Sequence, residues 1–108
     1  MLSGYRTMWS VVMFDLPVSS RKAVKAAQNF RKFLLAEGYF MKQFSVYMKF
    51  FDTREKAEAA GRRISGQVPE HGQVTNLHIT DKQFGLAKNY YGKLKEENDE
   101  KPTQLALF

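Results

Sequence analysis

The feature that most constrains this chain is an almost unbroken apolar run from Met8 to Phe14, which ends in Asp15-Leu16-Pro17. The run is rich in β-branched and aromatic residues, and this composition predicts a strand that is covered on both faces. Proline has no N–H for a ladder hydrogen bond and disfavours helix in the residue before it, so the strand ends here. Asp15 is therefore expected at the rim of a sheet, where it either bonds loop amides or serves as a functional carboxylate.

A helix is expected after this strand, with Ser19 or Ser20 as its N-cap and its end near Glu37, because Gly38 follows. Its apolar residues recur with the spacing of one helical face, at Ala23, Val24, Ala27, Phe30 and Leu34. Arg31 lies on the same side, so its guanidinium either extends to the edge of the apolar face or reaches a phosphate or carboxylate of a partner.

The remaining elements are expected in a fixed order. Two short strands lie in 39–51, joined by a turn at 43–45, and a helix capped by Asp52 or Thr53 follows. A strand over 73–80, a turn that starts at Asp81 and a short strand over 87–91 complete the order. The order strand, helix, strand, strand, helix, strand predicts an α+β, ferredoxin-like βαββαβ fold with one short extra strand. In that fold one antiparallel sheet carries both helices on one face. We expect a single domain over residues 1–92, followed by a charged linker and an apolar docking tail over residues 93–108.

The positive charge is concentrated in the first half of the chain. Residues 1–50 contain eight Lys or Arg and two carboxylates, which equals the whole net charge of +6. Such a surface suits a phosphate-rich partner, although ordinary solubilising charge gives the same count. The cations that we consider as nucleic-acid ligands are Arg21, Lys22, Lys25, Arg31, Lys42 and Lys49.

Several kinds of site are excluded by the composition. Cysteine is absent, which excludes disulfides and thiolate metal sites. His71 and His78 have no spaced companions that would form a metal site or a catalytic triad. No glycine loop of the P-loop or dinucleotide-binding kind is present. No stretch resembles a signal peptide or a membrane span, so we expect a cytoplasmic protein without a membrane partner.

The chain ends in Gln104-Leu105-Ala106-Leu107-Phe108, an apolar segment after a charged linker. Such an end either covers a sheet edge, adds a strand to another protein by β-augmentation, or frays as chain ends do. We expect Leu105, Leu107 and Phe108 to dock on a partner. The pentapeptide also resembles a bacterial sliding-clamp binding motif.

Four ordered blocks carry a resemblance to a known family. They are Val12-Met13-Phe14-Asp15-Leu16-Pro17, the segment from Phe30 to Tyr39, Gln43-Phe44-Ser45-Val46-Tyr47 and Thr80-Asp81-Lys82-Gln83-Phe84. Together they resemble the Cas-two family of small CRISPR-associated adaptation proteins, in the version found in loci with a Cas-nine effector. The resemblance spans about residues 8–92.

The resemblance implies a ferredoxin-like homodimer that bridges two pairs of the Cas-one integrase and helps to capture short double-stranded DNA as new spacers. It also implies a metal-dependent endonuclease that cuts RNA or double-stranded DNA, with Asp15 as the Mg²⁺ ligand. Arg21 follows the loop in which family members use basic residues, and Arg31 lies in the matching helix block. The chain offers no second acid beside Asp15, so a hydrolytic site would need the Asp15 carboxylates of two protomers.

Two functional classes therefore compete, a DNA-binding scaffold for adaptation and a Mg²⁺-dependent nuclease. A free-standing RNA-binding module is a third alternative, with Phe44, Tyr47 and Phe50 as stacking aromatics. A toxin-type ribonuclease on the same fold is a minor fourth. We expect the scaffold to be the physiological role and any nuclease activity to be secondary.

Overall fold

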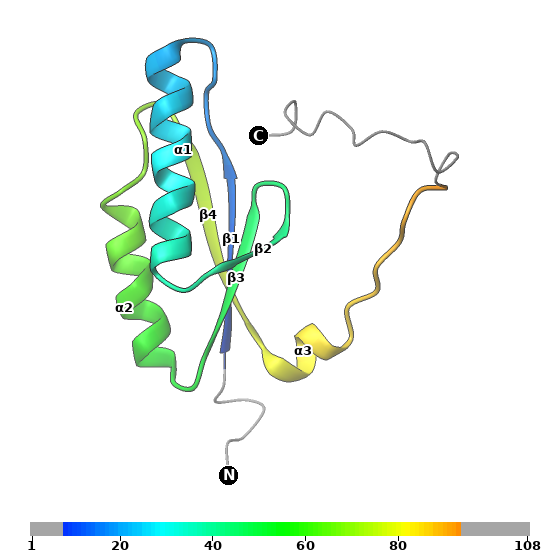
Figure 1. The fold of residues 1–108 in the computed structure, drawn as a ribbon. Coiled ribbons are helices and arrows are strands. Elements are labelled where there is room, and N and C mark those ends of the chain that lie inside the picture. The colour runs from blue at the N-terminus through cyan, green and yellow to red at the C-terminus, as the bar shows by residue number, and fades with distance from the viewer. Residues whose placement is uncertain (1–7, 94–108) are drawn as a thin grey trace.

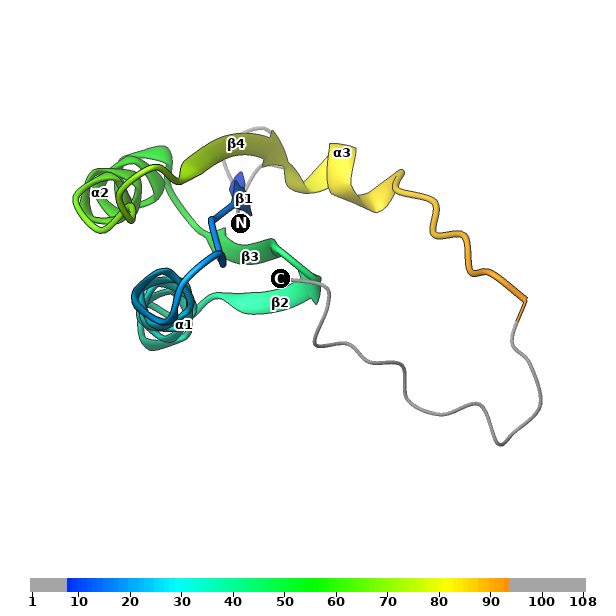
Figure 2. The same ribbon diagram turned by 90° about the horizontal axis from the view of Figure 1, so that it is seen from above.

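The computed structural model describes residues 8–93. Its elements in chain order are β1 (Met8–Asp15), α1 (Arg21–Ala36), β2 (Phe40–Gln43), β3 (Val46–Phe51), α2 (Arg54–Ser65), β4 (Gln73–Thr80) and α3 (Asp81–Gly85). The four strands form one antiparallel sheet in the order β2-β3-β1-β4. Helices α1 and α2 lie on the same face of this sheet, as Figure 1 and Figure 2 show. The predicted ferredoxin-like α+β fold is confirmed.

Strand β1 lies in the interior of the sheet, because it pairs with β3 on one side and with β4 on the other. Its central position gives it hydrogen-bonding neighbours on both sides, but of the two faces predicted to be covered, helices α1 and α2 cover one within residues 8–93. Its side chains alternate between the two faces of the sheet. Val12 and Phe14 face the helices and are buried, whereas Trp9, Val11 and Met13 face the other side and are only partly buried.

Helix α1 begins and ends where local interactions predict. The Ser20 hydroxyl accepts a hydrogen bond from the Ala23 N–H at 3.0 Å, which makes Ser20 the N-cap. At the other end Glu37 is the C-cap, and Gly38 follows with a φ of +96°, a conformation that glycine adopts without steric strain. The residues of α1 that are buried against the sheet are Ala27, Phe30 and Leu34.

The hydrophobic core lies between the helices and the sheet. Helix α2 starts at the N-cap Thr53, one of the two predicted caps, and buries Ala57, Ala60 and Ile64. From the strands, the core receives Val12, Phe14, Tyr47 and Phe51. The predicted hairpin is also confirmed, because β2 ends at Gln43 and β3 begins at Val46.

The prediction for the residues after β4 was wrong in two respects. Asp81 begins the short helix α3, where a turn was expected. Residues 87–91, expected to form a strand, are not part of any strand. A strand needs a neighbour to pair with, and Figure 1 shows this segment leading away from the sheet after α3. None of the helices between residues 8 and 93 has the length and apolar character needed to cross a bilayer.

Candidate functional site

One face of the sheet is covered by α1 and α2, and we call the opposite face the open face. The strand register and the side-chain alternation place a set of mostly apolar residues on it: Trp9, Val11, Met13, Phe40, Met48, Phe50, Leu77 and Ile79. Several of them keep large exposed fractions, 46% for Leu77, 45% for Phe40 and 39% for Phe50. An apolar surface of this kind on a small domain is typical of an interaction site.

Trp9 is the centre of an aromatic cluster at one end of the open face. Its ring lies with centroid distances of 5.3 Å from Phe50, 6.1 Å from Phe40 and 4.7 Å from Phe84 of α3. Its indole Nε1–H donates a hydrogen bond of 2.8 Å to the Asp81 carboxylate. These contacts hold α3 against the open face, and they fix the point from which the following segment leaves the domain.

Residues 86–93, which we call the exit segment, also expose large apolar side chains. Leu86 is 74% exposed, and Tyr90 and Tyr91 are each 85% exposed. The segment is connected to β2 by a hydrogen bond of 3.0 Å from Lys42 Nζ to the Asn89 side-chain oxygen. It therefore carries apolar groups that the described part of this single chain does not cover.

Asp15 lies at the end of β1 on the open face, because it follows Met13 by two residues along the strand. It is exposed, and its partner in the β4 register is Gln73. Within residues 8–93 no three His, Cys, Asp or Glu side chains come together in a group that could hold a metal ion. A carboxylate oxygen suits Mg²⁺, but one chain supplies a single such ligand at this position, so the chain fits only half of a shared site.

The predicted nucleic-acid ligands lie in four separate places. Arg21, Lys22 and Lys25 are exposed in the first turns of α1, and we call them the N-terminal basic cluster. Arg31 is partly buried further along the same helix, and Lys42 lies on the edge strand β2. Arg21 and Lys25 of this cluster line a hollow of about 540 Å³.

Lys49 has a structural role that its charge alone does not reveal. Its Nζ donates a 2.6 Å hydrogen bond to the backbone carbonyl of Glu37, at the C-terminal end of α1, and lies 4.9 Å from the centre of the Phe51 ring. A cation at this end of a helix satisfies an unpaired carbonyl and interacts favourably with the helix dipole. Lys49 therefore joins α1 to β3, and its binding of nucleic acid stays a prediction.

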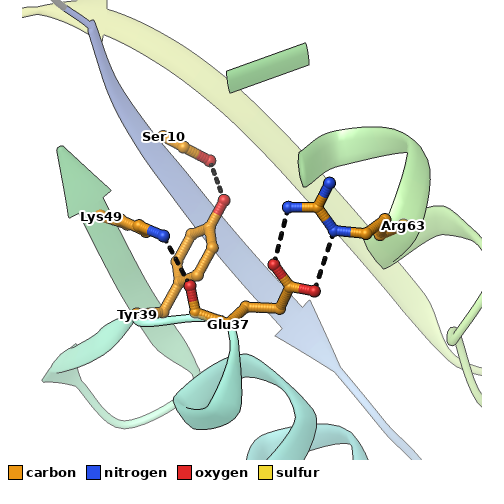
Figure 3. Close-up of polar contacts among 5 residues, drawn as sticks. All are labelled: Ser10, Glu37, Tyr39, Lys49 and Arg63. Atoms are coloured by element: carbon orange, nitrogen blue, oxygen red, sulfur yellow. Dashed lines mark hydrogen bonds and ion pairs between the residues drawn. The ribbon is translucent and has the colours of Figure 1, made fainter. Parts of the chain in front are cut away.

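Glu37 is also joined to α2 through its side chain. Its two carboxylate oxygens accept hydrogen bonds from Arg63 Nε at 2.9 Å and Arg63 Nη2 at 2.8 Å, as Figure 3 shows. This hydrogen-bonded guanidinium lowers the pKa of the Glu37 carboxyl below its ordinary value of 4.5. The sequence alone does not predict this pairing, because the two residues come from different helices that only the fold brings together.

Polar side chains on the covered face form a chain that is buried at Ser10 and Tyr39 and reaches the exposed Asn76. Ser10 is fully buried, and its hydroxyl lies 2.7 Å from the Tyr39 hydroxyl while donating to the Asn76 side-chain oxygen at 2.9 Å. Burial raises the pKa of the Tyr39 phenol above 10.0, so the phenol is neutral at physiological pH. The lone polar residue in the apolar run of β1 is therefore part of a network that joins β1 to β4 and to Tyr39, the residue before β2.

Comparison with known proteins gives a consistent result. Residues 8–86 match the family described as CRISPR associated protein Cas2. The "CRISPR-associated endoribonuclease Cas2" of Flavobacterium psychrophilum is 48% identical over 107 residues, covering 99% of this chain and 93% of the relative. The protein of the same description from Parvibaculum lavamentivorans is 46% identical over 101 residues, covering 94% of this chain and 100% of the relative. A solved structure titled "Crystal structure of cas2" is similar with a TM-score of 0.49 at 24% identity, covering 84% of this chain and 95% of that chain.

Proposed function

Because the chain belongs to the CRISPR-associated Cas2 family, we propose that it is an adaptation subunit, a homodimer that binds short duplex DNA and bridges dimers of the Cas-one integrase. The open face is the observation that carries the proposal. It combines an uncovered apolar surface, the Asp15 carboxylate at its rim and a strand that is apolar on both faces.

The open face is the surface through which two copies associate. Its exposed apolar residues include Leu77 and Phe50, and burying such groups is the main favourable contribution in association. The exit segment carries Tyr90 and Tyr91 beyond the domain, and the outer edge of β4 has no strand beside it within residues 8–93. The exit segment of one copy pairing with β4 of the other would satisfy both features.

The N-terminal basic cluster is the DNA-contacting surface of this proposal. Arg21, Lys22 and Lys25 lie at the positive end of the α1 dipole, and the first turn contains no acidic residue. Cations at this end of a helix are locally unfavourable, and a bound phosphate removes that repulsion. Contacts of this kind hold the backbone of a duplex without recognising its base sequence.

Three further parts of the proposal come from the sequence. Leu105, Leu107 and Phe108, the residues expected to dock on the integrase, lie outside the described residues. Their docking is part of the proposal, as are the cytoplasmic location and the association with a Cas-nine locus. The clamp-binding resemblance of the same C-terminal end also stays a prediction.

The proposal is tested by spacer integration in vitro. The integrase of the same locus and a short duplex are mixed with wild-type protein or with Asp15→Asn. We expect integration to require this protein and to survive the substitution, since a scaffold needs no carboxylate for hydrolysis. Integration that proceeds equally well without this protein would contradict the scaffold function.

A metal-dependent endonuclease is the second candidate function, and two observations favour it. The relatives are described as endoribonucleases, and Asp15 lies on the face through which two copies would meet. Two facing Asp15 carboxylates would hold Mg²⁺, which supplies Lewis acidity toward a phosphate and activates water. The chain itself would position the metal at the dimer axis through this side chain.

The nuclease function is tested with purified protein and labelled single-stranded RNA. Cleavage should require Mg²⁺, disappear with a chelator and fall by at least about 100-fold in Asp15→Asn, because the variant lacks the charged ligand. Glu70→Gln, which removes an exposed loop carboxylate, is the matched control. Equal cleavage by wild type and Asp15→Asn would point to a contaminating nuclease.

A further inference from the structure

A second basic region lies at the other end of α1. It is a groove of about 460 Å³ between β3 and α2, and its lining residues are Lys49, Phe50, Phe51, Asp52, Lys56, Ala59 and Arg63. Three of these residues are cations and one is a carboxylate. The lining is therefore positive, and Lys49 and Phe51 place the groove mainly on the helix-covered side of the sheet, while Phe50 belongs to the open face.

Two of the groove cations are held in place from within the fold. Glu37 binds Arg63 through its carboxylate and Lys49 through its backbone carbonyl, as Figure 3 shows. The Phe51 ring supports the Lys49 ammonium from a further side. Side chains fixed in this way lose little conformational entropy when a ligand binds.

The held cations keep hydrogen-bonding capacity. A guanidinium has five N–H groups and an ammonium three, and Glu37 accepts two from Arg63 and one from Lys49. Lys56 forms an ion pair of 3.2 Å with Asp52, and the two side chains are 65% and 47% exposed. Exposed ion pairs of this kind are weak, so a phosphate oxygen can replace the Asp52 carboxylate as the partner of Lys56.

We propose that this groove is a second binding site for backbone phosphates of duplex DNA. The inference rests on the proposed DNA-binding function and adds a contact region to it. Helix α1 has 16 residues, begins at the N-terminal basic cluster and ends at Glu37 beside the groove. It separates the two regions by ~24 Å, at 1.5 Å per residue.

That separation is shorter than one helical turn of a duplex, which is ~34 Å, so both regions fit along a single duplex. Phosphates of one strand advance by 3.4 Å per base pair, so ~24 Å corresponds to about seven base pairs. A single duplex lying along α1 thus contacts the N-terminal basic cluster at one end and the groove at the other. In this arrangement the helix layer of the protein carries the DNA, and the open face remains available for the second copy.

The test is a salt titration of duplex binding by fluorescence anisotropy, with a labelled duplex of roughly 20 base pairs, longer than the span of both regions. Lys56→Gln should lower the slope of log K against log salt by about one, because one phosphate contact is lost. Arg62→Gln is the matched control, since Arg62 is an exposed cation on the same helix that does not line the groove. An equal loss of slope in both variants would indicate diffuse charge attraction and overturn the inference.

A second pair of variants should strengthen duplex binding instead of weakening it. Asp52→Asn removes the carboxylate that competes for Lys56 and should tighten duplex binding. Glu58→Gln removes an exposed carboxylate of α2 that does not line the groove, and it should tighten binding less. Equal effects of the two substitutions would also count against the groove.

The failure of this inference is distinguishable from the failure of the proposed function. If the double substitution Arg21→Gln and Lys25→Gln weakens duplex binding while the groove variants behave as their controls, only the assignment of the groove as a DNA contact fails. If the wild-type protein binds no duplex, the proposed function fails with it. A further measurement adds inorganic phosphate alone and follows the NMR shifts of Lys56. If phosphate saturates the groove but Lys56→Gln has no effect on duplex binding, the inference is overturned.

Discussion

The two faces of the sheet differ in what covers them, although both faces of β1 carry apolar side chains. On the covered face Val12 and Tyr47 are 0% and 4% exposed, because α1 and α2 pack over them. On the open face Leu77 and Phe50 remain 46% and 39% exposed, and within residues 8–93 only α3 covers part of it, at Trp9. Both faces of β1 are nevertheless apolar, which is why the strand reads as an unbroken hydrophobic run.

The comparison indicates that the hydrophobic pattern of a strand reflects every surface that the strand contacts in the functional state, including surfaces of other molecules. The covered face is completed within the chain and determines folding. In the proposed dimer the open face is completed by association, so its apolar residues should affect the oligomeric state more than the stability of the monomer. The following predictions test that division of roles.

The largest effect is expected in the core between the covered face and the helices. Phe30→Ala removes a ring that packs on Phe14 at 5.3 Å and should lower the free energy of unfolding by about 3–5 kcal/mol. Urea denaturation followed by circular dichroism measures this change. Leu35→Ala, at a site 54% exposed on the same helix, is the control and should cost much less. Similar losses for the two variants would show that Phe30 is not part of the core.

The open face is tested by Leu77→Asp. A buried charge in an apolar interface should weaken dimer formation by at least about 30-fold, or ~2 kcal/mol, while the folded monomer persists. Analytical ultracentrifugation over a range of concentrations measures the dissociation constant. Leu35→Asp places the same charge on α1 and should leave the dimer intact. If Leu77→Asp still dimerises as tightly as the wild type, another surface joins the two copies.

A smaller effect is expected where α3 covers the open face. Asp81→Ala removes the carboxylate that accepts the Trp9 hydrogen bond, which should lower the free energy of unfolding by ~1 kcal/mol. Trp9 is the single tryptophan, so its fluorescence should move to longer wavelength as α3 loosens. Glu70→Ala removes a loop carboxylate and should leave the emission unchanged. An unchanged spectrum in Asp81→Ala would mean that stacking with Phe84 alone holds α3.

The smallest effect concerns the ion pair beside the groove. The folded-state pKa of Glu37 is lowered, so its contribution to stability is complete above pH 4.5, the ordinary value, and is lost as the pH falls through the lower folded-state pKa. Glu37→Gln should therefore show a shallower loss of stability in acid than the wild type, measured by urea denaturation at pH 7 and pH 3. Glu58→Gln should retain the wild-type pH dependence. Identical acid profiles for Glu37→Gln and wild type would exclude the pairing as a source of stability.

Features set by neighbouring residues could be predicted from the sequence. Ser20, Thr53 and Gly38 act within one turn of the helix ends that they define, so the local pattern was sufficient. Helix α3 was predictable in the same way, because Thr80 and Gln83 form a capping box at its start. The sequence predicts only a turn at Asp81 by periodicity, because a helix of five residues is too short to show an apolar pattern.

Features made by distant residues could not be predicted. The Glu37–Arg63 pair and the Lys49 contact depend on how α1, α2 and β3 meet, and charge counts contain no such information. The strand expected at residues 87–91 has apolar and aromatic residues, yet β structure also requires a neighbour that the described part of one chain does not supply. The position of Asp15 at the rim was predicted, because proline ended the strand at a definite residue.

The strand order also has a consequence for how the protein is made. Along its whole length β1 pairs with β4, from Met8 opposite Thr80 to Asp15 opposite Gln73, so its second neighbour is synthesised last among the strands. Contacts between residues so far apart in the chain close slowly, because a long loop must be ordered before they form. During translation β1 therefore lacks its β4 partner, and keeps apolar side chains uncovered, until nearly the whole domain has left the ribosome. The nascent chain is most prone to aggregation in that interval, and folding is completed as a late event.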